Sequence, residues 1–312
     1  MVSYSYKVTL IDLLDKEIII REKEYNIQLE EKKKLCVDTD IKKDTTLAGY
    51  KTIKNHLLKF NIDKDYRDID NDDIEEFKYY LLESANTKIG GVITYFKYIK
   101  AIFNKLIKNN KLTHNPIQVP SKSKLVQQEK VIFTHKEINT ILDNMNKEDS
   151  LLFRILLKTG MRLDELCSLK KGNIKNNSFH FYDSKYYFKK IVPISSDILE
   201  DVLHQIKTLS DDEYILHRNY KNKYRVNNVR NSISKAIKKY TTDKTVHKTR
   251  TTFITYLNYF NSGFSDKDIS SITHKLSGVD DKFYAKLRNL DNLKDIINSV
   301  DFKNLEEIEL VS

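Results

Sequence analysis

Apolar side chains recur at steps of three and four through the first 120 residues, which is the period of helices with one buried face. The pattern predicts a helix over residues 9–36 and a second over residues 47–60. A third begins behind the acidic cap Asp70–Asp73, because a carboxylate accepts hydrogen bonds from the first N–H groups of a helix. The Gly90-Gly91 pair predicts a break before a fourth helix, from about Val92 to Asn109. The first 120 residues should therefore form a helical bundle.

The pattern changes period once in the rest of the chain. Thr134, followed three residues later by Glu137, predicts a capping box at the start of another helix. Between Ser178 and Ile194 the apolar period falls to two, which predicts a β-hairpin with its tip around residues 184–187. Apolar residues then alternate along each predicted strand, at Phe179 and Phe181 in the first and at Ile191 and Pro193 in the second. Helical periodicity returns from Ser196 to the end.

A polar segment divides the chain. Asn115-Pro116 closes the bundle, and the stretch PSKSKLVQQEK at 120–130 has the low apolarity of an exposed linker. We therefore expect two domains, over residues 1–120 and 131–289, with a linker at 121–130 and a C-terminal segment at 290–312. The fold class predicted is mainly α with one small β-hairpin or sheet.

Composition narrows the class of protein. Seven glycines and three prolines in 312 residues favour helices over turn-rich β structure, and the net charge of +10 indicates a polyanionic partner. The stretch from His217 to Arg250 contains eleven Lys and Arg residues but a single acidic residue, Asp243. Two distant cysteines, Cys36 and Cys167, predict neither a disulfide framework nor a metal site. Charges interrupt the apolar N-terminus, so we expect a cytoplasmic protein without a membrane span.

Two boxes far apart in the chain carry the candidate chemistry. In the first, LLKTGMRLDELCSL at 156–169, Gly160 ends a helix and Arg162 lies at the junction with the next one. In the second, VHKTRTTF at 246–253, His247 and Arg250 are three apart and so share a helix face. A guanidinium presents a fixed fork of donors that matches a phosphate. The two arginines therefore predict a phosphate site.

The order of these boxes resembles the tyrosine recombinase family, also called phage integrases. TGMRLDELCSL is similar to the family's first arginine box and HKTRTTF to its second, with His274 and Tyr284 following in the expected order. The resemblance covers nearly the whole chain. It implies an N-terminal helical, SAM-like core-binding domain that clamps DNA, and a C-terminal α+β domain that breaks and rejoins DNA.

The resemblance also implies roles. Arg162 and Arg250 would bind the scissile phosphate, His247 and His274 would add hydrogen bonds, and Tyr284 would be the nucleophile that forms a 3′-phosphotyrosine. Lys185 at the hairpin tip would protonate the leaving 5′ oxygen, with Lys189 and Lys190 as alternatives. Glu165 would orient the basic cluster. No metal or other cofactor is expected.

The implied substrate is double-stranded DNA, bound by four protomers on paired recombination sites of a phage or other mobile element. Whether an accessory DNA-bending protein takes part is left open, as is whether residues 290–312 dock on a neighbouring protomer or on their own domain. The basic side chains expected on DNA are Lys97, Lys100, Lys105, Lys108, Arg218, Lys221, Lys223, Arg225 and Arg230.

The sequence departs from the family pattern in places. The usual spacing would put Phe283 in the nucleophile's slot, one residue before Tyr284, and Thr273 stands where glycine is usual. Thr249 and Thr251 replace the typical leucine and histidine. If Tyr284 does not reach the phosphate, the protein would be a catalytically inactive DNA-binding relative. A type IB-like topoisomerase, which shares the chemistry, is the other alternative. A metal-dependent nuclease is disfavoured because the acidic clusters, at 70–73 and 211–213, lack ligand spacing.

Overall fold

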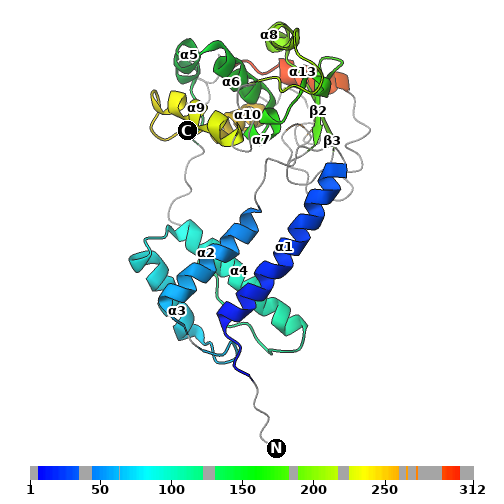
Figure 1. Ribbon diagram of the computed structural model, residues 1–312. Coiled ribbons are helices and arrows are strands. Elements are labelled where there is room, and N and C mark those ends of the chain that lie inside the picture. Colours follow the sequence, from blue (N-terminus) through cyan, green and yellow to red (C-terminus); the bar gives the residue numbers. More distant parts are fainter. Residues whose placement is uncertain are drawn as a thin grey trace, which may run out of the picture. The chain divides into compact units, whose positions relative to one another are not determined.

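The computed structural model describes residues 6–34, 44–62, 64–121, 131–182, 189–216, 225–259, 265, 272 and 290–302. The chain divides into two compact units, Met1–Gln127 and Gln128–Ser312. Helices dominate both units, as the sequence predicts, and one small sheet lies in the second (Figure 1). Each unit has its own hydrophobic core.

The first unit is a helical bundle. Its elements are α1 (Leu10–Lys34), α2 (Thr45–Phe60), α3 (Asn71–Tyr79), the π-helical turn η2 (Tyr80–Ser84) and α4 (Ile89–Lys108). Asp44 caps α2 by accepting from the backbone N–H groups of Thr46 and Leu47, and Asp70 caps α3 in the same way. Both caps satisfy backbone donors that have no partner within the helix. The predicted acidic cap of the third helix is confirmed.

The fourth helix begins earlier than its sequence suggests. Gly90 and Gly91 lie inside the first turn of α4, which starts at Ile89, and so do not break the chain before it. Glycine destabilises a helix little in its first turn, because several N–H groups of that turn lack intrahelical partners anyway. The apolar face predicted for this helix is confirmed, with buried Val92, Phe96, Ile99, Ile102, Phe103 and Leu106.

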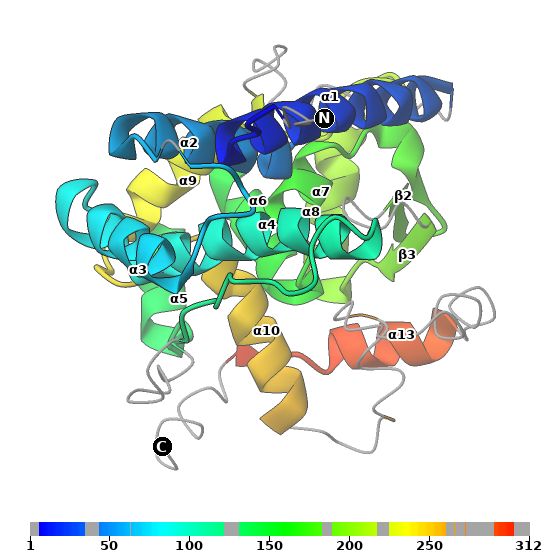
Figure 2. The ribbon, with the colours of Figure 1, turned by 90° about the horizontal axis from the view of Figure 1, so that it is seen from below.

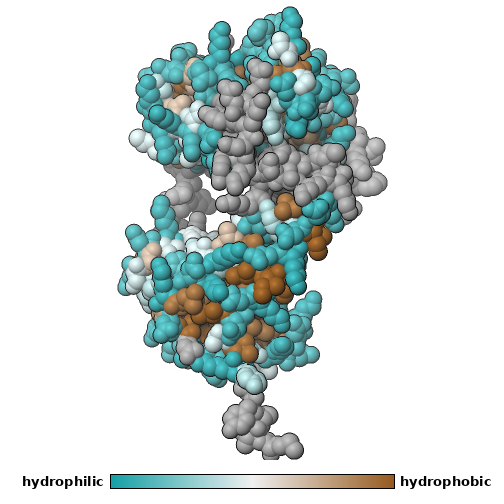
Figure 3. All heavy atoms as spheres, viewed as in Figure 1, coloured by the Kyte–Doolittle hydropathy of each residue, from teal (hydrophilic) through white to brown (hydrophobic). Residues whose placement is uncertain are grey.

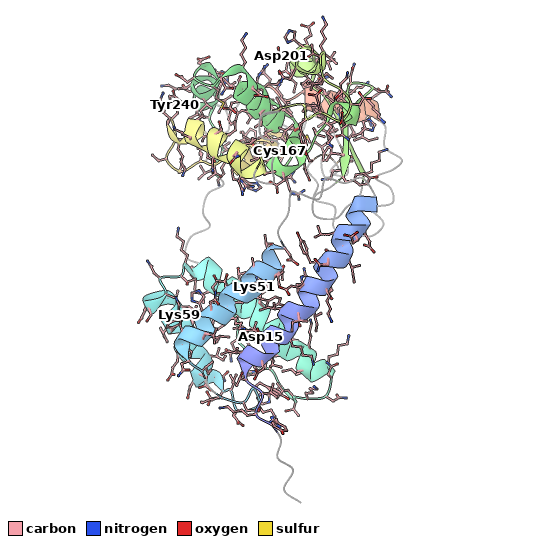
Figure 4. The ribbon with its side chains drawn as sticks, viewed as in Figure 1. Asp15, Lys51, Lys59, Cys167, Asp201 and Tyr240 are labelled. Carbon is pink, nitrogen blue, oxygen red and sulfur yellow. The ribbon has the colours of Figure 1, made fainter. Side chains whose placement is uncertain are left out.

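Ion pairs and apolar contacts join α1 to the helices beside it. Lys54 on α2 contacts Asp15 on α1, and Lys51 contacts Glu22 at 2.7 Å. Asp15 on α1 and Lys51 on α2 are labelled in Figure 4. Leu10 and Leu14 of α1 are fully buried in the core of this unit. The apolar contacts contribute most of the stability here, because exposed ion pairs are each worth only about 0–1 kcal/mol.

The second unit places helices around a short sheet. Its helices are α5 (His135–Asp143), α6 (Lys147–Thr159), α7 (Leu163–Cys167), the 3₁₀ turn η3 (Lys171–Asn173), α8 (Ser196–Ile206), α9 (Arg225–Lys238), α10 (His247–Tyr259) and α13 (Leu290–Asn298). The capping box predicted at Thr134 and Glu137 is present at the start of α5.

The sheet contains β1 (Ile174–Lys175), β2 (Ser178–Tyr182) and β3 (Lys189–Pro193), antiparallel and in the order β1-β2-β3. The predicted hairpin is confirmed, although its tip lies outside the described residues. Ile191 and Pro193, the alternating apolar residues of the second strand, lie on the face opposite Phe179 and Phe181, and Pro193 is buried. Phe179 pairs with Val192 and Phe181 with Lys190, so Lys190 and Val192 share the face of the two phenylalanines. Ile191 lies on the opposite face and is only half-buried.

The segment after the expected nucleophile packs on its own unit. Leu293, Ile296, Ile297, Val300 and Phe302 are buried in the core of the second unit. Helix α13 lies near α10 (Figure 2), and the backbone N–H of Asp301 donates to the hydroxyl of Tyr256 on α10 at 3.1 Å. Residues 290–302 therefore pack on the second unit, and docking of the C-terminal segment on a neighbouring protomer stays a prediction. Residues 303–312 lie outside the described part.

Apolar side chains gather on part of the first unit's surface. Figure 3 shows several brown groups on the visible face of this unit. The exposed apolar residues of the first unit include Ile19, Ile27 and Leu58. No helix among the described residues combines the length and apolarity that crossing a membrane requires.

Candidate DNA strand-transfer site

A left-handed glycine sets the direction of the first arginine. Gly160, at φ 59°, ends α6, and its N–H donates to the Leu156 carbonyl at 3.0 Å. The chain then turns, so that Arg162 becomes the residue before the first turn of α7. Its backbone N–H donates to Glu165 Oε2 at 2.9 Å, which closes the start of this short helix. The predicted helix junction at Arg162 is therefore present.

Glu165 anchors the Arg162 side chain. Arg162 Nη1 donates to Glu165 Oε1 at 2.8 Å, and the Glu165 side chain is fully buried. Lys190 Nζ lies 3.4 Å from the same oxygen. The Arg162 side chain keeps 27% of its surface exposed, so it reaches from a buried anchor toward the surface.

The second arginine is fixed to the same turn. Arg250 Nη1 donates to the backbone carbonyl oxygen of Gly160, two residues before Arg162, and Arg250 is 8% exposed. The ring of Phe253, one turn further along α10, lies where a side chain on Gly160 would be. A Cβ built on Gly160 would come within 2.4 Å of this ring. The absent side chain lets α10 approach the end of α6 closely enough for Arg250 to reach it.

The positive charges of both arginines act on His247. Partial burial of its ring lowers the pKa of His247 below its ordinary value of 6.5, and the positive charges of Arg250, Arg162 and Lys248 lower it further. Each cation disfavours a second positive charge nearby, so the imidazole is neutral at pH 7. His247, Arg162 and Arg250 therefore form one electrostatic cluster, although His247 lies 85 positions after Arg162 in the chain.

Two threonines tie α10 into the unit. The Thr252 hydroxyl accepts from the backbone N–H of Phe133 at 2.9 Å and donates to the Lys248 carbonyl at 2.8 Å. Thr249, in the position of a usual leucine, is 1% exposed and donates to the Val246 carbonyl. Its hydroxyl is thus satisfied, so a polar residue is accommodated at a buried position.

Comparison with known proteins assigns this arrangement to a family. Residues 132–275 match the Phage integrase family, and residues 24–125 match the Phage integrase SAM-like domain. The chain belongs to the phage integrase, or tyrosine recombinase, family. Its first unit is the SAM-like domain of this family and its second unit is the catalytic domain.

Individual relatives differ in how much they share with this integrase-family chain. Tyrosine recombinase XerA of Pyrococcus horikoshii is 28% identical over 184 residues, 57% of this chain and 61% of XerA. The Integrase of Escherichia phage 186 is 28% identical over 113 residues, 34% of this chain and 33% of the relative. The matches therefore span less than two thirds of these relatives.

Solved structures share the fold of the whole chain. A lambda integrase dimer bound to a COC′ core site has a TM-score of 0.63 at 18% identity, covering 88% of this chain and 97% of that one. The Tn1549 transposon integrase, in complex with circular intermediate DNA, has a TM-score of 0.60 at 17% identity, covering 92% and 98%. The predicted fold class is confirmed.

Three of the catalytic residues expected in this tyrosine recombinase lie outside the described residues. Lys185, His274 and Tyr284 therefore stay predictions. Of the alternatives to Lys185, Lys189 is exposed on β3, whereas Lys190 is 5% exposed and held near Glu165. The sequence did not predict this buried position of Lys190. Side chains alternate between the two faces of a strand, so pairing Phe181 with Lys190 would have indicated that Lys190 faces inward. The sequence alone does not give this pairing.

The basic residues expected on DNA have different surroundings. Lys97, Lys105 and Lys108 are exposed on α4 and Lys100 is half-buried, while Lys105 also contacts Glu17 of α1. Arg230 on α9 is exposed, and its Nη2 donates to Asp164 of α7 at 3.1 Å. Arg218, Lys221, Lys223 and the side chain of Arg225 lie outside the described part of the chain.

The anchor of the C-terminal segment was missed in the sequence. Lys158 near the end of α6 donates to the Val300 carbonyl and lies 2.9 Å from Asp197. Ser196 N–H donates to Asn298 Oδ1 at 2.9 Å. The two hydrogen bonds join residues 142 and 102 positions apart, so no local pattern indicates them. Among the described residues, no group of three or more His, Cys, Asp or Glu could hold a metal ion.

Proposed function

We propose that this protein is a site-specific DNA recombinase that cleaves and rejoins DNA through a 3′-phosphotyrosine, for integration or excision of a phage or other mobile element. The observation that carries the proposal is the meeting of Arg162, Arg250 and His247 around the turn at Gly160. Family membership supports the same function.

In this mechanism the two guanidinium groups bind the non-bridging oxygens of the scissile phosphate. Negative charge gathers on these oxygens as phosphorus becomes five-coordinate, and preorganised donors stabilise it. His247 and His274 add hydrogen bonds. Arg162 and Arg250 are both anchored at one turn, so little reorganisation is needed when the phosphate binds.

The bond changes balance without a cofactor. The phenol oxygen of Tyr284 attacks phosphorus while its proton passes to a neutral imidazole, a role open to His247 because of its lowered pKa. The bond from phosphorus to the 5′ oxygen breaks, and that oxygen takes a proton from Lys185. The phosphotyrosine keeps the energy of the broken bond, so a 5′ hydroxyl can later reseal the strand without ATP.

The substrate and assembly follow from the same proposal. The SAM-like domain at residues 1–120 and the catalytic domain at 131–289 would hold duplex DNA, with basic side chains such as Lys97 and Lys108 against its phosphates. Four protomers would assemble on two recombination sites. A lambda integrase tetramer bound to a Holliday junction, with a TM-score of 0.66 at 16% identity, shares the fold on which this rests.

The decisive experiment uses a nicked suicide duplex whose sequence the wild-type protein has selected from a random pool. Wild type should form a covalent protein–DNA complex that survives denaturation, and Tyr284→Phe should form none. Tyr79→Phe, which removes a hydroxyl from an exposed tyrosine of the first unit, is the matched control and should behave as wild type. Equal complexes for Tyr284→Phe and wild type would remove Tyr284 from this role. If wild type binds DNA without forming a complex, the inactive DNA-binding alternative holds.

A second measurement separates recombination from topoisomerase activity. Relaxation of a supercoiled plasmid that lacks the selected site would favour the type IB-like alternative. Strand exchange between two plasmids that each carry the site would favour recombination. Persistence of cleavage in EDTA is expected in both cases, because neither mechanism requires a metal.

A further inference from the structure

Lys190 lies on the buried face of the sheet, among apolar side chains. It pairs with Phe181 across β2 and β3, on the face that also holds Phe179 and Val192. Lys190 is 5% exposed, and its ammonium nitrogen lies 5.7 Å from the centre of the Phe181 ring. Burying an ammonium is costly unless a partner compensates its charge. Packing alone therefore gives no reason for a lysine here.

The compensating charge belongs to Glu165. Its Oε1 is 2.8 Å from Arg162 Nη1 and 3.4 Å from Lys190 Nζ, and its Oε2 accepts from the backbone N–H of Arg162. The carboxylate is fully buried, so both cations act on it with little screening by solvent. Glu165 thus shares its one negative charge between Arg162 and Lys190.

We propose that Lys190 is a positioning residue that acts on the phosphate-binding Arg162 through Glu165. Lys190 holds the carboxylate from the side of the sheet, so Glu165 presents a fixed oxygen to the guanidinium. Lys190 also neutralises part of the negative charge of Glu165. The carboxylate therefore offsets less of the positive charge of Arg162, which is left to attract a phosphate. The inference rests on the proposed function, because it gives Lys190 a task in that reaction.

The same contact couples the hairpin to the arginine. Strand β3 begins at Lys189, four residues after Lys185, the residue expected to protonate the leaving oxygen. Lys190 therefore fixes the base of the hairpin to the anchor of Arg162. The Lys190 side chain is 4% exposed and its ammonium lies near Glu165. This buried position suits a positioning role, whereas a proton donor to DNA must reach the surface.

The test compares variants of the full chain on the selected suicide duplex. Lys190→Met should slow formation of the covalent complex, by up to roughly a hundredfold, since small displacements of catalytic groups can cost that much. Lys175→Met removes an exposed cation from β1 of the same sheet and should leave the rate unchanged. In a Glu165→Gln background, Lys190→Met should cause no further loss, because its effect passes through the carboxylate.

A second substrate separates positioning from proton donation. When sulfur replaces the bridging 5′ oxygen, the leaving thiolate needs no proton, so this duplex should restore the rate of Lys185→Met. It should not restore Lys190→Met. Restoration of Lys190→Met by the thiolate duplex would instead make Lys190 the acid and overturn the proposal.

Other outcomes also decide. An equal loss in Lys190→Met with and without Glu165→Gln would show that Lys190 acts independently of Glu165. An equal loss in Lys175→Met would show a general effect of the positive charge of the sheet. Circular dichroism and thermal unfolding check that each variant folds. Should Lys190→Met not fold, the double variant, in which both buried charges are absent, is compared with Glu165→Gln alone. The proposed function fails separately, when wild type forms no covalent complex with either duplex.

Discussion

Arg250 donates a hydrogen bond to the backbone carbonyl of Gly160, ninety residues earlier in the chain. This bond joins the two arginine boxes at one turn, because Arg162 follows Gly160 by two residues. The position of each guanidinium thus depends on the backbone that orients the other. A change at Gly160 is therefore expected to affect both arginines.

Gly160→Ala should destabilise the protein and disturb Arg250. The φ of 59° is unfavourable for a side chain, and the new Cβ would lie 2.4 Å from the Phe253 ring. We expect a loss of about 1–3 kcal/mol in the free energy of unfolding, measured by urea denaturation followed by circular dichroism. Gly90→Ala is the control, since nothing lies within 4 Å of its Cβ. Identical unfolding of the two variants would contradict the close approach described here.

Arg162→Lys and Arg250→Lys should each slow formation of the covalent complex by about 10²–10³-fold. Lysine keeps the charge but lacks the planar fork that binds two oxygens. The rate is measured on the suicide duplex under single-turnover conditions. Arg154→Lys is the control, because Arg154 pairs with Asp201 at 2.7 Å on the surface. Near-wild-type rates for the two site variants would mean that charge alone suffices.

His247 should make the protein less stable in mild acid. Its folded pKa lies below the ordinary value of 6.5, so the unfolded chain binds the proton more readily as the pH falls. The stability that neutral His247 contributes is full above that ordinary value and is lost as the pH falls through the folded pKa. His247→Gln should lose less stability than wild type between pH 7 and 5, measured by thermal unfolding. His56 and His180, also with lowered pKa, remain in both proteins, so the difference isolates His247.

Tyr256→Phe should loosen the segment that follows α13. The Tyr256 hydroxyl accepts from the backbone N–H of Asp301 at 3.1 Å, and a hydrogen bond of this kind contributes about 1 kcal/mol. Amide hydrogen exchange in residues 290–302 should become faster. Tyr79→Phe, an exposed tyrosine of the first unit, should leave that exchange unchanged. Unaltered exchange in Tyr256→Phe would show that the buried apolar residues hold α13 by themselves.

Lys97 and Lys108 should contribute to DNA binding without regard to sequence. Replacing both by Ala should weaken affinity for a random duplex and reduce the slope of log affinity against log salt by about 0.9 for each phosphate that the variant no longer neutralises. Fluorescence anisotropy over a range of salt concentrations measures both quantities. Lys64→Ala, at a lysine bound to Asp73 at 2.6 Å, is the control. A salt slope unchanged by the double variant would place the DNA on another face.

The sequence by itself determined most of the elements that the structure describes. Helical periodicity, the caps at Asp70 and Thr134, and the turn at Gly160 are local features, since each depends on residues within a few positions. The two arginines and His247 are likewise identified by the short boxes that contain them. The family resemblance then implied a catalytic role for each of these residues. The roles of His274 and Tyr284 stay predictions, because both residues lie outside the described part of the chain.

Only the tertiary structure decided how these residues are held. The bond from Arg250 to Gly160, the contact of Lys190 with Glu165 and the anchor of the C-terminal segment at Lys158 each join residues 25 to 142 positions apart. Strand register decided that Lys190 faces inward, because a shift of one residue would turn its side chain to the other face. Such contacts depend on where the packed core places whole elements, and no local pattern contains that information.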